Sequence, residues 1–350
     1  MTLTLSEPLF NALLAVVKIL FVWAMTLAAL LPNLIWAERR VSGLIQDRPG
    51  PNRVGPLGLF QAVADVLKLM MKEDVVPLYV DKVLFTLAPL ITLTPALVTF
   101  AVIPFGSSIP ISWNGAVRDV PLVIADVNVG ILYIFALTSL AVYGIVLAGW
   151  SSNDKYSLLG GVRASAQIIS YELAMGFSAA GVFIAAGSLR LPAVVEWQHA
   201  HLWNVVPQFF GFVVFAVAIF AETNRIPFDL SEAEAELVAG YHTEYSSFRF
   251  AMFFMGEYAN LIAASAVVTT LYFGGWSLPG VAFTGLWGGL ASIAVFAVKT
   301  AAFIFLFLWV RWTLPRFRYD QLMELGWKVF LPLSFFHLIA VAAFVAASGR

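Results

Sequence analysis

Long apolar stretches dominate this chain and limit its fold more than any other feature. Hydrophobic residues make up 61% of its 350 residues, whereas soluble proteins contain about 45 to 50%. A helix needs about 20 mainly apolar residues to cross the hydrocarbon core of a membrane. The sequence therefore predicts an all-α integral membrane protein, a single polytopic domain over residues 1–350 with about eight transmembrane helices. The apolar stretches cover residues 9–37, 83–104, 125–150, 164–187, 205–222, 249–273, 286–312 and 328–347.

Basic residues are distributed unequally between the connections. Most of the 20 Lys and Arg residues lie in alternate connections, among them Arg39, Lys155 and Arg316. Because basic loops stay on the cytoplasmic side of a membrane, we expect these connections inside and both termini outside. The first stretch has no basic residue before it and no small-residue cleavage site, so we expect a retained span rather than a signal peptide.

Residues that hold redox cofactors are rare. The chain has no cysteine, which excludes thiolate-bound iron–sulfur clusters and disulfides. Its four histidines do not form facing pairs within the predicted spans, as a membrane haem would require. We therefore expect no haem or iron–sulfur cluster on this chain. We also expect no flavin, no metal and no nucleic-acid partner. Any electron carrier would belong to a partner protein.

Carboxylates are concentrated in the inside connection at residues 222–248. The run ETNRIPFDLSEAEAELVAGYHTE holds six of the 21 acids of the chain. Such a cluster beside membrane helices suits cation binding, proton transfer or docking of a soluble partner, and the residues alone leave these functions open. The acids are Glu222, Asp229, Glu232, Glu234, Glu236 and Glu244.

Three charged residues, Glu172, Glu257 and Lys299, lie well inside predicted spans. A charge at the centre of a membrane helix costs about 2.5 to 3.5 kcal/mol on the insertion scale, so such residues face a protein interior or a wet cavity. One interpretation is structural: the carboxyls stay protonated, or a Glu–Lys pair holds helices together. The other is a polar path in which Glu172, Glu222 and Glu257 exchange protons through water.

The inside connection at residues 38–82 has two parts. The first, AERRVSGLIQDRPGPNRVGPLG, contains Pro and Gly residues that prevent a continuous helix. The second predicts an amphipathic helix at about residues 58–73, which is too short and too charged to span and suits the membrane interface. A plain surface anchor is the alternative. The apolar face of the helix holds Phe60, Val63 and Leu67, and its polar face holds Asp65 and Lys68.

Four long blocks of sequence occur in the order of a known family. They are AERRVSGLIQDRPGPNRVGPLGLFQAVADVLKLMMKED, GWSSNDKYSLLGGVRASAQIISYELAMG, AETNRIPFDLSEAEAELVAGYHTEYSSFRFAMFFMGEYAN and LPRFRYDQLMELGWK. Through these blocks nearly the entire chain resembles a family of membrane subunits of NADH:quinone oxidoreductase, respiratory complex I, whose mitochondrial counterpart is called subunit 1.

The resemblance implies a membrane-arm subunit at the junction with the peripheral arm of a proton-translocating enzyme. In that family the subunit forms part of a quinone chamber, with ubiquinone or menaquinone as substrate, and an acidic path that couples quinone reduction to proton translocation. The implied partners are the hydrophilic quinone-site and iron–sulfur subunits, the small membrane-arm subunits and membrane lipid. The implied location is an energy-transducing membrane, the inner membrane of a bacterial cell.

Carried over by position, the resemblance assigns two groups of residues, with no catalytic residue and no metal ligand on this chain. Relatives sometimes carry a further acid in the third span, where this sequence has Ser139, whose hydroxyl holds water but does not titrate near neutral pH. The expected quinone-binding residues are Glu38, Arg39, Phe60, Asp65 and Lys68. The expected proton-coupling residues are Glu172, Glu222, Asp229, Glu232, Glu234, Glu236 and Glu257.

Three other functions stay open at this point. A stand-alone cation or proton transporter would show internal repeats and interrupted helices in matching halves, and we find none in the sequence. A homologous subunit of a membrane-bound hydrogenase or formate-linked complex is less favoured, because the ERR, GPNRVGP and ETNRIPFDL blocks are intact. A scaffold that only joins two arms would use the Arg- and Pro-rich loops for docking.

Overall fold

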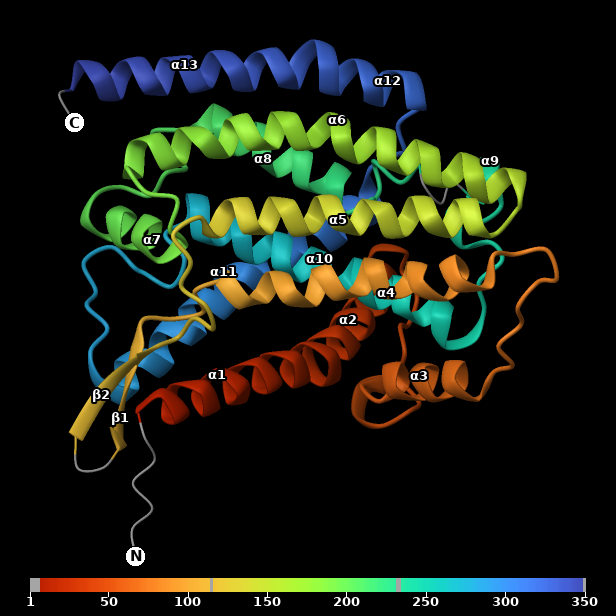
Figure 1. The fold of residues 1–350 in the computed structure, drawn as a ribbon, viewed down its shortest axis with the longest axis horizontal. Coiled ribbons are helices and arrows are strands. Elements are labelled where there is room, and N and C mark those ends of the chain that lie inside the picture. Colours follow the sequence, from red (N-terminus) through yellow and green to blue (C-terminus); the bar gives the residue numbers. More distant parts are fainter. Residues whose placement is uncertain (1–6, 114–115, 231–233, 349–350) are drawn as a thin grey trace, which may run out of the picture.

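The computed structural model describes residues 7–113, 116–230 and 234–348. Long helices run side by side between two ends of the molecule (Figure 1). Within the described residues, seven helical segments are long and apolar enough to cross a membrane. They are α1 with α2 (Glu7–Ala24 and Leu31–Ile45), α4 (Lys82–Val98), α5 (Gly130–Ser151), α6 (Lys155–Ala186), α10 (Ser247–Tyr272), α11 (Gly285–Thr313), and α12 with α13 (Tyr319–Glu324 and Leu331–Ala347).

The expected span at residues 205–222 forms a shorter helix, α8 (Phe209–Glu222). At 1.5 Å per residue its 14 residues extend about 21 Å, less than the hydrocarbon thickness of about 30 Å. The backbone N–H of Val205 instead donates to the carbonyl of Tyr272, at 3.0 Å. The apolar run is thus divided between α8 and a loop that packs against the end of α10.

Successive long helices alternate in direction, so their connections fall at two ends (Figure 1). The termini end, where α1 begins and α13 ends, also holds the short helix α7 (Leu191–Ala200) and a hairpin. In the hairpin, β1 (Ser108–Trp113) pairs antiparallel with β2 (Ala116–Pro121). The loop end lies opposite and holds α3 (Gln61–Met71) and α9 (Glu234–Leu237).

Helix α10 lies at the centre of the fold. In its most apolar 18-residue window 72% of the residues are buried, against 6% for α1 with α2. It packs against α2, α4, α7, α8 and α11. Its neighbour α4 packs closely against α5 at a small residue: a Cβ on Gly144 of α5 would lie 2.2 Å from Oγ1 of Thr92 on α4. Side chains on α10 are therefore held between several helices.

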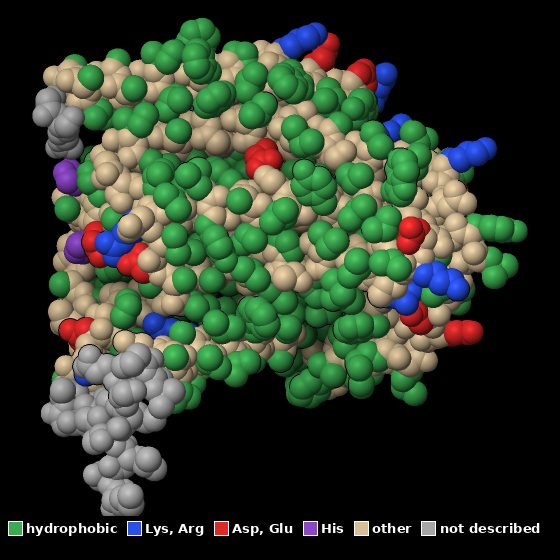
Figure 2. Space-filling view, in the orientation of Figure 1, with side chains coloured by type: hydrophobic (Ala, Val, Ile, Leu, Met, Phe, Trp, Pro, Cys, Tyr) green, Lys and Arg blue, Asp and Glu red, His purple; other side chains and the backbone are tan. Residues whose placement is uncertain are grey.

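The outer helices present apolar side chains to their surroundings. Phe21, Val298 and Phe344 are 67%, 70% and 74% exposed. Figure 2 shows a broad band of hydrophobic side chains on one face, with most charged side chains gathered toward the two ends. Apolar exposure on this scale suits lipid rather than water. The predicted fold class, an all-α integral membrane protein, is confirmed.

Candidate functional site

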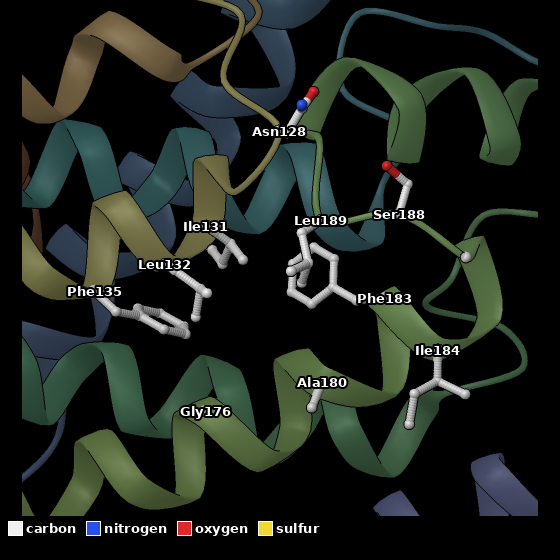
Figure 3. A pocket seen from close by; sticks show the side chains of 11 residues that line it. Asn128, Ile131, Leu132, Phe135, Gly176, Ala180, Phe183, Ile184, Ser188 and Leu189 are labelled. Carbon is white, nitrogen blue, oxygen red and sulfur yellow. The ribbon is translucent and has the colours of Figure 1, made fainter.

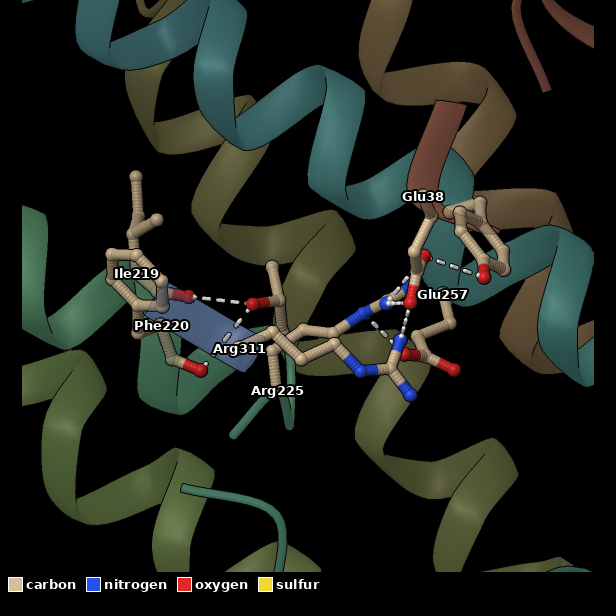
Figure 4. Close-up of polar contacts among 8 residues, drawn as sticks. Glu38, Ile219, Phe220, Arg225, Glu257 and Arg311 are labelled. Carbon is tan, nitrogen blue, oxygen red and sulfur yellow. Dashed lines mark hydrogen bonds and ion pairs between the residues drawn. The ribbon is translucent and has the colours of Figure 1, made fainter. Parts of the chain in front are cut away.

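Charged residues from four parts of the fold meet inside the protein, toward the loop end (Figure 4). Glu38 lies on α2, Arg225 in the connection after α8, Glu257 on α10 and Arg311 on α11. Nη1 of Arg225 lies 3.2 Å from Oε2 of Glu38, and its Nε lies 2.6 Å from Oε1 of Glu257. Arg311 also pairs with Glu38. We call these four residues, with Tyr258, the ion-paired cluster.

Tyr258 completes the cluster from the next position of α10. Its hydroxyl donates to Oε2 of Glu38 at 2.8 Å. Its ring lies under the guanidinium of Arg225, with 4.4 Å between the guanidinium carbon and the ring centroid. Glu38 thus accepts hydrogen bonds from three side chains, which replace the water that its carboxylate loses on burial.

The end of α8 explains why Arg225 reaches this position. The Thr223 hydroxyl donates to the carbonyls of Ile219 and Phe220, at 3.1 and 3.3 Å (Figure 4). Asn224 then has a φ of 51°, a left-handed conformation that asparagine tolerates at helix ends. The chain turns back, and the N–H of Arg225 donates to the Phe220 carbonyl at 3.4 Å.

Pairing keeps Arg225 charged although its side chain is only 2% exposed. Burial alone would lower the pKa of its guanidinium, but Glu257 and Glu38 beside it raise that pKa above the ordinary value. Arg225 therefore stays cationic at any physiological pH. The net charge of the cluster can change only through its carboxyl groups.

A second pair of acids lies between α5, α6 and α8 and has different partners. Glu172 of α6 is hydrogen-bonded to the Ser139 hydroxyl of α5, which also lies 2.8 Å from the carbonyl of Phe135. Glu222 is the last residue of α8 and is hydrogen-bonded to Thr138. It lies close enough to Glu172 for the two carboxylates to repel each other. Neither acid forms an ion pair in the part of the chain that the structure describes. We call Glu172 and Glu222 the carboxyl pair.

Two small cavities lie beside Glu222, and the larger of them reaches the ion-paired cluster. Their volumes are about 30 and 40 Å³, and Thr138, Glu222 and Asn260 line both. The larger one is also lined by Glu257. A buried water needs roughly 10 to 15 Å³ of such space and two to four polar partners. Each cavity can hold a few waters, and the larger one places Glu222 and Glu257 on the same space.

The remaining acids of the 222–248 connection lie apart from this space. Asp229 pairs with Arg316 (2.9 Å), and Glu236 pairs with Arg163 (2.7 Å). Glu234 begins α9, and Glu232 lies outside the described residues. The structure therefore joins Asp229 and Glu236 to basic residues of neighbouring segments, and it joins Glu222 to the intramembrane acids.

The residues expected at the quinone-binding mouth separate into two places. Glu38 is buried in the ion-paired cluster, whereas its neighbour Arg39 points to α3 and pairs with Asp65 at 2.5 Å. Phe60, just before α3, is 53% exposed, and Lys68 on α3 is exposed. Glu38 thus belongs with Glu257 in space, while the other four residues lie on or beside α3.

Sequence reasoning missed Arg225, Arg311 and Tyr258 as site residues. One signal was available for Arg225, because it is the only Lys or Arg in the run from Glu222 to Glu244. A buried acid requires a cation or a proton. No comparable local signal identified Arg311.

Lys299, which lies within a predicted span, pairs with no acid among the residues that the structure describes. Nζ of Lys299 donates to the carbonyls of Phe273, Gly275 and Ser277, at 2.7, 3.0 and 2.7 Å. It also lies 4.4 Å from the ring centroid of Trp203. The structural alternative of a Glu–Lys pair is therefore wrong: Lys299 ties α11 to the chain that follows α10.

A groove of about 510 Å³ opens between α5 and α6 near the termini end (Figure 3). Asn128 and Ser188 lie at its polar edge, and its walls are mainly apolar. It reaches Phe135 and Gly176, which lie one helical turn from Ser139 and Glu172. The carboxyl pair is therefore close to a recess in the outer surface of the chain.

Comparison with known proteins identifies the family. The family model described as NADH dehydrogenase matches residues 17–342. The chain belongs to the NADH dehydrogenase family. It is 52% identical over 326 residues to a subunit of the NADH-quinone oxidoreductase of Geobacter metallireducens, covering 93% of this chain and 94% of that protein.

Two further relatives have related names. NADH-quinone oxidoreductase subunit 8 of Rhodothermus marinus is 50% identical over 345 residues, 95% of this chain and 97% of that protein. The corresponding NADH-quinone oxidoreductase chain of Leptospira biflexa is 50% identical over 307 residues, 86% of each chain. The NADH dehydrogenase family predicted from the four sequence blocks is confirmed, and with it the prediction of an oxidoreductase subunit in a membrane.

Proposed function

We propose that this chain is the complex I subunit that forms part of the quinone chamber and passes the effect of quinone reduction to the proton-translocating membrane arm. One observation carries the proposal: Arg225 is shared by Glu38 and Glu257, and Glu257 lines the same cavity as Glu222. The buried ion pairs, the carboxyl group of Glu222 and a cavity that can hold water thus adjoin one another.

The quinone side of the proposal rests on α3. A quinone, whether ubiquinone or menaquinone, has a long apolar tail and a polar headgroup. Val63 and Leu67 on α3 are 46% and 55% exposed, and they offer apolar surface to the tail beside the Arg39–Asp65 pair. Arg39 and the exposed Lys68 supply hydrogen-bond donors to the headgroup as it passes.

The coupling side rests on charge. Reduction of a quinone to a quinol consumes two electrons, supplied by a partner subunit, and two protons. Arg225 keeps its charge and holds Glu38 and Glu257 ionised, so the negative charge that quinone reduction creates nearby changes the electric potential at the cavity that Glu257 shares with Glu222. Waters in the shared cavity carry that change to Glu222 and then to Glu172. Neighbouring subunits respond to the altered charge.

Partners and orientation follow from the two ends of the molecule. We assign the loop end, with its Arg163–Glu236 and Arg316–Asp229 pairs, to the hydrophilic quinone-site and iron–sulfur subunits. The groove between α5 and α6 favours the small membrane-arm subunits beside the carboxyl pair. We place the loop end on the cytoplasmic side of a bacterial inner membrane and both termini outside.

Substitution of single acids in the assembled complex tests the proposal. Glu222→Gln and Glu257→Gln keep the size of the side chain and remove its charge. We expect both to lower proton translocation, while NADH oxidation by an artificial acceptor in the peripheral arm stays normal. Glu196→Gln is the matched control, because Glu196 is exposed on α7 at the termini end. Unchanged translocation in both variants contradicts the proposed function.

A further inference from the structure

Helix α3 is attached to the start of α10 by side chains of α10 rather than by apolar packing alone. The Ser247 hydroxyl points at the carbonyls of Leu69 and Lys72, each 2.9 Å away. The N–H of Val75 donates to Oγ of Ser246 at 2.9 Å. Leu69 lies in the last turn of α3, whose carbonyls have no partner within the helix. Ser247 therefore caps α3 from another helix.

An ion pair extends this contact by one more turn. Nε of Arg249 lies 3.3 Å from Oδ2 of Asp74. The same guanidinium lies 5.5 Å from the ring centroid of Phe85, which is buried on α4. We call the contacts of Ser246, Ser247 and Arg249 with residues 69–75 the α3–α10 seam. It joins a charged pair and four hydrogen-bond contacts within one short segment on each side.

The backbone of Ser247 is strained. Its φ is 53°, a left-handed conformation that residues other than Gly, Asn and Asp rarely adopt. Its side chain is nonetheless buried, with the residue 4% exposed. Strained residues persist where their surroundings fix them, and they cluster at functional sites. Glycine would relieve the backbone here, so the hydroxyl of Ser247 is the feature that offsets the strain.

The seam connects α3 to both carboxylates of the ion-paired cluster. At one side Asp65 of α3 holds Arg39, the residue next to Glu38 on α2. At the other side Ser247 lies on α10, the helix that carries Glu257 and Tyr258. A movement of α3 therefore pulls on the two helices whose carboxylates share Arg225.

We propose that Ser246 and Ser247 are positioning residues that transmit a displacement of α3 to α10 and so to the ion-paired cluster. The inference rests on the proposed function, because it takes α3 as the wall that quinone displaces. It adds a mechanical route to the route through waters in the cavity. Neither serine touches the quinone or exchanges a proton; both act through the position of α10.

The first test asks whether the seam holds α3, and it needs no ligand. Hydrogen–deuterium exchange is measured on the purified complex with Ser247→Ala, Ser247→Gly or Ser246→Ala. We expect exchange in residues 69–75 to rise roughly fivefold in the Ser247 variants, the effect of losing about one net hydrogen bond, and less in Ser246→Ala. Exchange in Ser247→Gly as slow as in the unaltered complex overturns the proposal.

The matched control is Ser265→Ala. Ser265 is also buried on α10, but its hydroxyl donates to the Leu261 carbonyl of the same helix, at 2.8 Å. We expect this variant to leave exchange in residues 69–75 unchanged. Equal effects of Ser265→Ala and Ser247→Ala would show a general loosening of α10 and contradict a specific seam.

The second test asks whether the α3–α10 seam transmits a displacement of α3 to α10. A short-tail ubiquinone is added to the complex, and we expect slower exchange in residues 61–71 and also in residues 247–258. In Ser247→Ala the protection of residues 61–71 should remain and that of residues 247–258 should disappear. The ratio of protons translocated to electrons transferred should fall about twofold while quinone reduction stays within about twofold, a split that general destabilisation does not produce.

The outcomes separate the two proposals. Protection of residues 247–258 that persists in Ser247→Ala overturns transmission through the seam and leaves the quinone chamber intact. Absence of protection in residues 61–71 of the unaltered complex overturns the quinone-binding role of α3, and with it the transmission. In that case the first test still decides whether the serines hold α3.

Discussion

The ion-paired cluster and the carboxyl pair are two ways of burying acids in the same protein. In the first, Glu38 and Glu257 meet the guanidinium of Arg225, and Glu38 also meets that of Arg311. In the second, the acids are hydrogen-bonded to the hydroxyls of Ser139 and Thr138, and neither is ion-paired among the residues that the structure describes.

The partners of a buried acid determine how easily its charge can change. A carboxylate held between guanidinium groups cannot lose its charge without leaving a buried cation unpaired. An acid held by hydroxyls can gain or lose a proton while its neighbours only reorient, since a hydroxyl both donates and accepts. The ion-paired cluster therefore fixes the junction of four segments, and we propose that the charge of the carboxyl pair is the one that changes.

We expect the largest effect from removing Arg225, the cation that Glu38 and Glu257 share. Arg225→Met leaves Glu38 and Glu257 buried with one cation fewer, and we expect a loss of about 3 to 5 kcal/mol in stability. The amount of assembled complex, measured by native electrophoresis, should fall sharply. Arg163→Met is the control, because its partner Glu236 is 51% exposed and an exposed pair contributes at most about 1 kcal/mol. Similar assembly of the two variants contradicts the special status of Arg225.

Much of the fold follows from the sequence, because the membrane thickness fixes how long an apolar helix must be. The stretches at residues 83–104 and 125–150 overlap α4 and α5, although the first ends six residues beyond α4 and the second begins five residues before α5. Local patterns also marked Glu172 and Glu257 as unusual, since charges are rare within spans. The expected helix at residues 205–222 was too long, because Val205 bonds to the end of α10.

The partners of the acids were beyond sequence reasoning. Glu38 meets Arg225 across 187 residues and Arg311 across 273. Such contacts depend on how helices pack, and helix packing leaves no local pattern. The sequence marked Ser139 only as a hydroxyl that does not titrate near neutral pH; the structure places this hydroxyl directly against Glu172.

Adding a cation to the carboxyl pair would make it resemble the ion-paired cluster. Ser139→Lys places an ammonium group beside Glu172, and we expect proton translocation to fall about tenfold, equivalent to about 1.4 kcal/mol. Quinone reduction should persist at a reduced rate. Ser139→Asn, which is polar and uncharged, serves as the control. Full translocation in Ser139→Lys would show that the charge of this pair is irrelevant.

Neutralising one member of the pair has a smaller expected effect. Glu172→Gln removes one carboxyl group but leaves Glu222 and the two cavities beside it. We expect the ratio of protons translocated to electrons transferred to fall about threefold to fivefold, roughly 1 kcal/mol, with normal assembly. Reconstituted vesicles report both quantities. A loss of assembly instead would mean that Glu172 is a structural residue.

We expect the smallest effect on proton translocation from removing the Ser139 hydroxyl, which is hydrogen-bonded to Glu172. Ser139→Ala removes one hydrogen bond to Glu172, and we expect about a twofold fall in proton translocation, within the range of one net hydrogen bond. Ser178→Ala is the control on α6, since the Ser178 hydroxyl donates to the Met175 carbonyl at 2.8 Å. Translocation equal in the two variants argues against a role for Ser139.

Infrared difference spectroscopy can identify which buried acids change protonation when quinone is reduced. It records the carbonyl stretch of protonated carboxyl groups in the complex before and after quinone reduction. We expect a change in this band that is lost in Glu172→Gln and in Glu222→Gln and is retained in Glu38→Gln. A band that persists in both variants of the carboxyl pair, or that vanishes only in Glu38→Gln, would contradict this expectation.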